Sequence, residues 1–242
     1  MAAIGWKGFE DQLARRKPVF WWRDDDAATP SPALERLLAL SAASRVPLAL
    51  AVIPMLAASS LFSLLDEKIS VLQHGCDHVN RAAPGGKKTE FSETEDKHMA
   101  LERLARARSR LQQLAGERAV PVLAPPWNRF RQDLLTDLPS IGLRGLSCYG
   151  PRREAEAAPG LRQVNTHIDI VDWHQGRRFI GEERAFDLVM KYFSRDEPVG
   201  WLTHHAVHDA AAWEFLARLF TVPGACWASA EELFSYTRPA HG

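Results

Sequence analysis

The sequence has few cysteines and no excess of charge of either sign. Only three cysteines occur in 242 residues, at wide spacing. An odd and scattered set of this kind does not form the disulfide framework of a small secreted domain. Thirty basic residues balance thirty acidic ones, and neither sign forms a long block. Proteins that bind nucleic acid carry a basic stripe or tail, so we expect no nucleic-acid partner.

Long hydrophobic runs are also absent. No stretch approaches the roughly 18 apolar residues that a membrane-spanning helix needs. The first 17 residues carry several charges and no long apolar stretch, unlike a secretory signal peptide. We therefore expect a cytoplasmic protein without a membrane span. The remaining composition, 46% hydrophobic and 25% charged, is that of a globular protein long enough to bury a sizeable core.

Short apolar runs alternate with helix-like segments along the chain. Strands are predicted at 18–22, 47–53, 69–72, 120–123, 143–149, 199–203 and near 226–227, and the stretch 164–171 carries His167 and Asp169. Helices are predicted at 30–40, 54–65, 93–114, 129–138, 184–193, 209–220 and 229–236. Strands that alternate with helices predict an α/β fold whose parallel sheet is buried on both faces. No repeat or linker divides the chain, so we expect one domain, 1–242.

Polar clusters follow the predicted strands rather than the helices. In barrels and open α/β sheets alike, active sites lie in the loops after the carboxyl ends of the strands. We therefore expect the clusters to meet at one rim. They are Asp24-Asp25-Asp26, His74 with His78, the segment 124–129, the segment 169–173, and His204-His205.

His74 and His78 lie four positions apart, just after the predicted strand 69–72. If the backbone turns helical after Leu72, both imidazoles fall on one helix face. Two imidazoles placed in this way can chelate one divalent cation. The alternative is a loop that contains one histidine satisfied by a hydrogen bond.

The three consecutive aspartates follow an aromatic-rich strand. Adjacent carboxylates repel one another, so a buried cluster persists only where a cation or an arginine neutralises it. The alternative is a solvated acidic turn that leads into the next helix.

Two further clusters have the chemistry of a site. The prolines before Trp127 make a rigid turn, which could aim the Trp127 N–H and the Arg129 guanidinium into a pocket. His204-His205 offers an acid–base histidine, with Asp169 or Asp172 as orienting carboxylates and Trp173 as an apolar wall. The alternatives are an ordinary strand exit, loop ion pairs and core tryptophans.

In this order the motifs resemble those of the polysaccharide deacetylases (NodB homology, carbohydrate esterase family 4). Arg23-Asp24-Asp25-Asp26-Ala27 is similar to the family's Thr-Phe-Asp-Asp-Gly, and His74 and His78 match its His-x-x-x-His. Ala124-Pro125-Pro126-Trp127 is similar to Arg-Pro-Pro-Tyr, and 169–173 to an Asp-x-x-Asp-Trp-like segment. The family's late strand-end histidine matches His204 or His205, and Trp201-Leu202-Thr203-His204 favours His204.

The resemblance implies a distorted (β/α) barrel of about seven strands. It also implies a metal-dependent hydrolase that removes an N-acetyl or other acyl group from a small or oligomeric amino sugar, or from a related amide. Asp25 would be the base, and Asp26, His74 and His78 would bind Zn²⁺, with Co²⁺ or Ni²⁺ as alternatives. His204 or His205, oriented by Asp172, would be the acid. We expect the substrate to contact Asp24, Pro126, Trp127, Asn128 and Trp173.

Three departures from the family pattern affect these assignments. Ala124 stands where the motif has the arginine that pairs with the base, so Arg129 or Arg23 must replace it, and we assign Arg129. Ala27 replaces the motif glycine, and Asp24 leaves the register of the aspartates open by one residue.

Two rival functions follow from the same residues. An inactive metal- or sugar-binding barrel would keep the histidines without turnover. A non-haem Fe(II) oxygenase would also use two histidines and a carboxylate, but that class has an antiparallel fold, which this pattern does not indicate.

Overall fold

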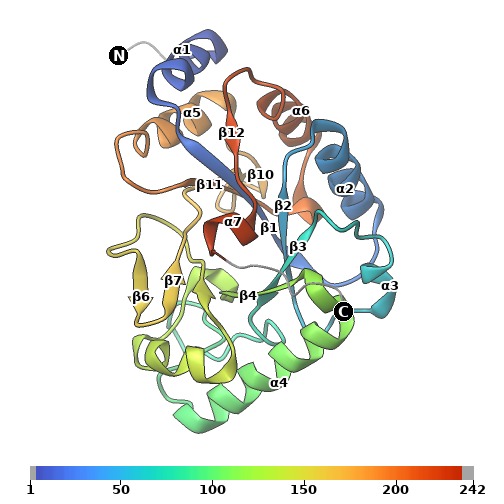
Figure 1. Cartoon of the computed structure of the whole chain (residues 1–242), viewed down its shortest axis with the longest axis vertical. Helices are drawn as coiled ribbons and strands as arrows, with labels where there is room; N and C mark the ends of the chain where they lie inside the picture. The colour runs from blue at the N-terminus through green and yellow to red at the C-terminus, as the bar shows by residue number, and fades with distance from the viewer. Residues whose placement is uncertain (1–3, 236–242) are drawn as a thin grey trace.

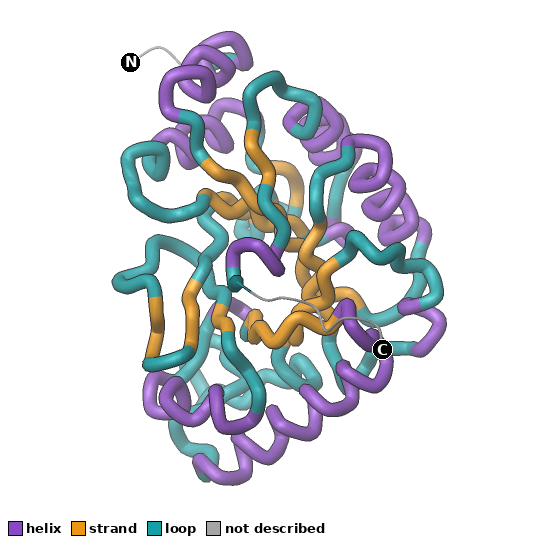
Figure 2. The backbone as a smooth tube through the Cα atoms, viewed as in Figure 1, coloured by secondary structure: helices purple, strands orange, loops and turns teal. Residues whose placement is uncertain are grey.

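The computed structural model describes residues 4–235 (Figures 1 and 2). The α-helices are α1 (Trp6–Arg16), α2 (Pro32–Ser44), α3 (Ser59–Phe62), α4 (Lys97–Ala115), α5 (Glu182–Met190), α6 (Ala210–Leu219) and α7 (Ala230–Leu233). The 3₁₀ helices are η1 (Gly116–Arg118), η2 (Pro126–Asn128), η3 (Gln132–Ile141) and η4 (His205–Val207). The strands are β1 (Val19–Ala27), β2 (Leu48–Val52), β3 (Ser70–His74), β4 (Ala119–Ala124), β5 (Gly145–Leu146), β6 (Glu156–Ala158), β7 (Leu161–Gln163), β8 (Ile168–Asp169), β9 (Val171–Asp172), β10 (Arg178–Phe179), β11 (Val199–Thr203) and β12 (Cys226–Trp227).

The main sheet curves into a ring of parallel strands. Its order is β7-β5-β4-β3-β2-β1-β11-β8, with β6 antiparallel to β7 and β12 beside β1. The stretch 161–169 contains both end strands and links them, since its first half pairs with β5 and its second half with β11. Backbone hydrogen bonds continue through this stretch, from Thr166 N–H to Cys148 O and from His167 N–H to Gly200 O. The prediction of a distorted α/β barrel of about seven strands is therefore confirmed.

Side chains of β1 alternate between the two faces of the sheet. Phe20 and Trp22 pack in the larger core, which lies between the strands and the surrounding helices. Trp21 points into the ring, where it packs with small and β-branched residues from β2 and β4 and with Phe234. The alternation continues into the charged end of β1, so Arg23 and Asp25 share a face that Asp24 does not.

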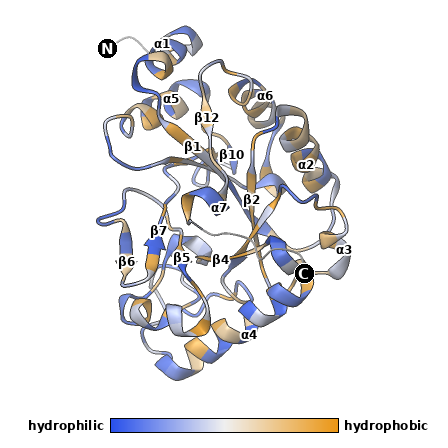
Figure 3. Cartoon of the chain, viewed as in Figure 1, coloured by the Kyte–Doolittle hydropathy of each residue, from blue (hydrophilic) through white to orange (hydrophobic). Residues whose placement is uncertain are grey.

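The helices cover the outside of the ring and are amphipathic. In α4 the buried residues recur every three or four positions, at Ala100, Leu104, Ala107, Leu111 and Ala115. Figure 3 shows that the helices carry both hydrophilic and hydrophobic residues. In the part of the chain that the structure describes, no helix is long and apolar enough to cross a membrane.

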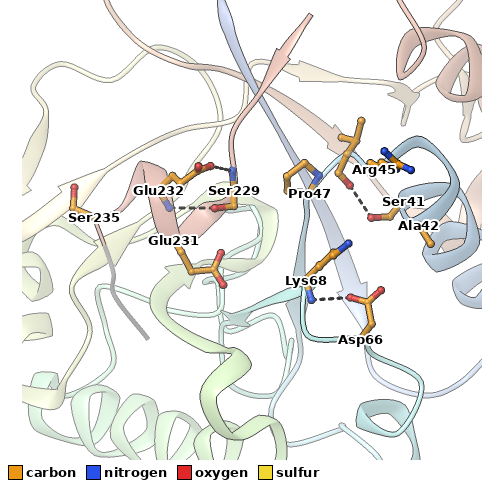
Figure 4. Close-up of a pocket in the computed structure, with 11 residues that line it drawn as sticks. Ser41, Ala42, Arg45, Pro47, Asp66, Lys68, Ser229, Glu231, Glu232 and Ser235 are labelled. Carbon is orange, nitrogen blue, oxygen red and sulfur yellow. Dashed lines mark hydrogen bonds between the residues drawn. The ribbon is translucent and has the colours of Figure 1, made fainter. Parts of the chain in front are cut away.

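The amino-terminal end of the ring is filled by α7, which lies at its centre in Figure 1. Leu233 and Phe234 pack in the interior cluster. Beside α7 a pocket of about 830 Å³ opens to solvent. Figure 4 shows that its lining comes from the segments that precede β2 and β3 and from α7. All of the residues predicted for the active site lie elsewhere.

Several helix predictions differ from the structure. The predicted helix 54–65 is reduced to α3, because the Met55 and Ala58 amides donate to Cys76 O and Ala28 O outside any helix. The predicted helix up to residue 138 is the 3₁₀ helix η3, which contains Pro139. In the predicted helix 229–236 the structure has α7, and residue 236 lies outside the described residues. Helix α1 was not predicted, although Trp6, Phe9 and Leu13 are spaced for it.

Candidate active site and metal centre

Three predicted ligands meet at the carboxyl end of the ring. Asp26 lies near the end of β1, His74 is the last residue of β3, and His78 follows four residues later. Oδ1 of Asp26 lies 3.1 Å from Nε2 of His74 and 3.2 Å from Nε2 of His78. One ligand atom from each residue lies within 4.8 Å of the others, and this is the one such group among residues 4–235.

The two histidines converge without a helix, so the helical turn considered after Leu72 does not form. Gly75 adopts a left-handed conformation with φ of +59°, and His78 does so with φ of +57°. The chain therefore reverses sharply after β3 and returns His78 to the ring of His74, with 5.3 Å between the ring centroids. The spacing of four residues correctly indicated that the two imidazoles meet, but a loop and not a helix brings them together.

The surroundings of this triad fit a divalent cation. Nδ1 of His74 lies 2.9 Å from the Ala124 carbonyl oxygen, so that nitrogen carries the proton and Nε2 is left as a lone-pair donor. Burial raises the pKa of Asp26, but His74 and His78 lower it more, and the net pKa lies well below its usual range. Two imidazoles and one ionised carboxylate are a donor set for zinc and similar transition metals.

Strained backbone also gathers at this rim. Four non-glycine residues here have a positive φ: Asp26 at 72°, His78 at 57°, Trp127 at 55° and Asn128 at 55°. Such conformations persist only where the surrounding structure imposes them, and they concentrate at functional sites. Their position supports a site at the carboxyl end of the ring.

Asp25 is held by Arg23, two residues before it on the same face of β1. The pair is bidentate, with Nε at 2.8 Å from Oδ1 and Nη2 at 2.9 Å from Oδ2. The remaining Arg23 protons are donated to Ser147, through its carbonyl and hydroxyl oxygens, and to Oδ1 of Asn128 at 2.7 Å. All five N–H groups of the buried guanidinium are thus used.

This arrangement corrects two assignments. Arg129 is exposed and donates to the Lys88 carbonyl oxygen, so Arg23 and not Arg129 is the partner of Asp25. Asn128, predicted to contact substrate, directs its side-chain oxygen to Arg23. The Arg–x–Asp spacing was the available signal, because residues i and i+2 of a strand lie on one face.

Asp24 lies on the opposite face of β1 and is fully buried. It accepts hydrogen bonds from the Thr203 hydroxyl at 2.6 Å and from the His205 backbone N–H at 3.0 Å, and its Oδ1 lies 2.5 Å from His205 Nδ1. Burial raises the pKa of Asp24, but interactions led by the adjacent His205 lower it by more, so the net pKa lies below its usual value. Asp24 therefore does not face substrate as predicted; it anchors the segment after β11.

His204, the first residue after β11, faces Asp169 and Trp173. Its Nδ1 lies 3.7 Å from Oδ1 of Asp169, and the Trp173 ring packs edge-on against it at 4.7 Å. Trp173 Nε1 donates to the other oxygen of Asp169 at 2.7 Å. Because His205 is tied to Asp24, His204 is the better placed of the two candidate acids.

The predicted orienting residue Asp172 is directed elsewhere. Its carboxylate accepts from the His174 and Gln175 backbone amides and pairs with Arg184 at 2.9 Å. Asp169, and not Asp172, lies beside His204, where the orienting carboxylate was expected. Alternation along the strand does not separate these two aspartates, because each belongs to a strand of only two residues.

The Pro-Pro turn forms a wall of the same rim. The Trp127 ring packs against His78 with 4.5 Å between centroids. Pro126 is buried and lies so close to Gly75 that a Cβ on Gly75 would come within 2.6 Å of the Pro126 ring. Ser147, Glu90 and Arg103 support this end of the barrel although no sequence motif contains them.

No protein-family model and no curated protein matches the sequence. Solved structures match it over nearly the whole chain. The peptidoglycan deacetylase PdaC from Bacillus subtilis is 14% identical, with a TM-score of 0.59 over 90% of this chain and 91% of that one. A family 4 acetyl xylan esterase from Clostridium thermocellum, in complex with a cobalt ion, is 14% identical, with a TM-score of 0.53 over 90% of each chain.

A third similar structure is a mutant of a CE4 family pseudoenzyme with restored enzymatic activity. It is 15% identical, with a TM-score of 0.57 over 92% of this chain and 69% of that one. The chain thus has the fold of the carbohydrate esterase family 4 proteins, as the motif order predicts.

Proposed function

We propose that this protein is a metal-dependent hydrolase that removes an acetyl or other acyl group from an amino sugar or a related amide. The observation that carries the proposal is the convergence of three functional groups at one rim. They are the Asp26–His74–His78 triad, Asp25 with its own arginine, and His204 with Asp169. The fold shared with solved deacetylases supports the same conclusion.

The triad would hold the cation, with zinc as the first expectation and cobalt or nickel as alternatives. When bound, a cation of this type polarises the carbonyl oxygen of the substrate and makes water more acidic. Each of the three residues offers one ligand atom, so coordination positions remain for water and substrate.

Asp25 would act as the base that takes a proton from the attacking water. Arg23 places a cation beside the Asp25 carboxylate and fixes its plane through two hydrogen bonds. The Trp127 N–H would donate to the oxygen on which negative charge develops. These roles need no residue outside the rim.

His204 would protonate the leaving nitrogen, without which the C–N bond does not break. Asp169 would orient its imidazole and stabilise the protonated ring. Besides burial, which raises the pKa of Asp26, and His74 and His78, which lower it, nearby His204 also lowers this pKa. The proposed acid and the proposed cation site are therefore close enough to act on one substrate.

The test combines metal content with acyl release. Wild-type protein, purified without added metal or a histidine tag, should contain about one equivalent of a divalent metal, and His78→Ala should contain none. Acetate release from N-acetylated glucosamine oligomers should stop on chelation and return with Zn²⁺, Co²⁺ or Ni²⁺. Absence of any bound metal, and of uptake on titration, would refute the proposal.

The alternative is a metal- or sugar-binding barrel without turnover. Ala124, at the position of the motif arginine, favours it, and a pseudoenzyme shares the fold. The bidentate Arg23–Asp25 pair opposes it, because this pair restores the charge that Ala124 lacks. Bound metal with no acyl release from a panel of acylated amino sugars would decide for the alternative. The mostly parallel sheet removes the support for an oxygenase.

A further inference from the structure

A buried carboxylate outside every motif lies beneath the loop between His74 and His78. Glu90 belongs to the connection between β3 and α4, outside every helix and strand. Its side chain is fully buried. A buried carboxylate needs a cation and several hydrogen bonds to persist.

Those partners are backbone amides of the histidine loop. The Cys76 N–H donates to both oxygens, at 2.9 and 3.1 Å, and the Asp77 N–H donates to Oε1 at 3.0 Å. Arg103, on α4, supplies the charge, with Nη1 3.0 Å from Oε1. Consecutive amides that follow a left-handed residue form a concave anion site, and here Glu90 occupies it.

Gly75 is required for this arrangement. Its φ of +59° is the left-handed conformation that opens the concavity, and a Cβ at this position would overlap Oε2 of Glu90. The loop contains no helical hydrogen bonds that could fix its shape. Instead, the Glu90 carboxylate accepts hydrogen bonds from the Cys76 and Asp77 amides, which lie between the two histidines.

We infer that Glu90, held by Arg103, is a positioning residue that fixes the loop 75–77 and so sets the separation of His74 and His78. The inference rests on the proposed function, since it assigns Glu90 to the same cation site. Glu90 does not touch the cation or the substrate. Its effect passes through the Cys76 and Asp77 amides.

Cys76 itself is not a ligand in this arrangement. Its side chain is buried among Phe91, Leu104 and Leu123, on the side of the loop that faces α4. The loop thus directs His74 and His78 to the site, whereas the Cys76 side chain between them is buried in the core.

The test compares Glu90→Gln with Glu95→Gln. Glu95 also pairs with Arg103, at 2.9 Å, but it makes none of the bonds to the Cys76 and Asp77 amides. Glutamine at position 90 would place an N–H₂ group against these donors. The readouts are the dissociation constant for Co²⁺, measured by competition with a chromophoric chelator, and the visible absorption spectrum of the bound Co²⁺.

We expect Glu90→Gln to weaken Co²⁺ binding about 10- to 100-fold, as loss of outer-shell support does in other metal sites, and to change the spectrum. Glu95→Gln should stay within about threefold of wild type with an unchanged spectrum. Wild-type affinity and spectrum in Glu90→Gln would overturn the inference. Equal weakening in both variants would also overturn it, because the effect would then belong to Arg103.

If Glu90→Gln does not fold, Glu90→Asp decides by the same two readouts. Its shorter side chain keeps the charge for Arg103 but cannot reach both amides, so weakened Co²⁺ binding is expected and wild-type binding overturns the inference. A wild-type protein that binds no Co²⁺ would instead refute the proposed function, and the inference with it.

Discussion

The two ends of the barrel differ in how their charged side chains are buried and bonded. At the carboxyl end, Arg23, Asp24 and Asp25 are buried, and their partners lie more than a hundred residues away or on the same strand. At the amino end, the pocket beside α7 is lined by polar residues with mostly local bonds, such as Lys68 N–H to Asp66 and Ser229 to Glu232. Buried charges are often no more stabilising than apolar side chains even when they are paired, so the buried charges at the carboxyl end indicate a role other than stability.

The largest effect should follow from removing the proposed base at the carboxyl end. Asp25→Asn should lower kcat about 10²–10⁴-fold, the range that acid–base catalysis contributes, while the metal content stays at the wild-type value. Acyl release and elemental analysis on the same preparation check both statements. An unchanged rate in Asp25→Asn would remove Asp25 from the mechanism.

Next in size is the loss of the arginine that neutralises this base. Arg23→Met should lower the free energy of unfolding by about 3–5 kcal/mol, because it leaves a buried carboxylate without its cation. Urea denaturation measures this change. The control is Arg129→Met, which removes an exposed arginine and should stay within about 0.5 kcal/mol of wild type. A large effect of Arg129→Met would reinstate the original assignment.

A smaller catalytic effect should separate two neighbouring aspartates. Asp169→Asn should lower kcat about 10- to 100-fold, part of what general acid catalysis supplies, because His204 loses its orienting carboxylate. Asp172→Asn, which removes only the interaction with Arg184 and the local amides, should leave kcat near the wild-type value. The opposite ranking would restore Asp172 to the role predicted from the sequence.

These pairs also show what the sequence could and could not predict. The strand ends, the meeting of Asp26, His74 and His78, and the barrel could be predicted from apolar runs and motif order, because the carboxyl ends of parallel strands meet at one rim. The Arg23–Asp25 pair was accessible from strand alternation. The choice between Asp169 and Asp172 was not, because it depends on a hairpin of two-residue strands and on Arg184. Glu90 reaches the site through a loop that no periodicity describes.

A fourth effect concerns stability and pH. Burial lowers the pKa of His167 to about 4, and its Nδ1 accepts the Gly200 N–H at 3.0 Å. In the unfolded chain this pKa returns to about 6.5, so between pH 6.5 and 4 the unfolded state binds more protons and stability falls as the pH is lowered.

The expected loss from His167 between pH 7.5 and pH 5 is about 2 kcal/mol. His167→Gln, which keeps an acceptor for Gly200, should lose correspondingly less over the same interval. Urea denaturation at the two pH values measures both proteins. Equal losses in wild type and variant would show that His167 does not titrate in this way.

The smallest effect should come from the amino end, and it sharpens the contrast. Ser229 caps α7, since its hydroxyl accepts the Glu232 N–H and the Glu232 carboxylate accepts the Ser229 N–H. Ser229→Ala should lower the free energy of unfolding by about 1 kcal/mol, the usual value of such a cap, and leave kcat and metal content unchanged. Because α7 fills the ring from below and touches none of the proposed ligands, a change in kcat without a loss of stability would mean that the two ends are coupled. The barrel would then have to transmit a change at α7 to the rim, and the division between a structural end and a chemical end would be wrong.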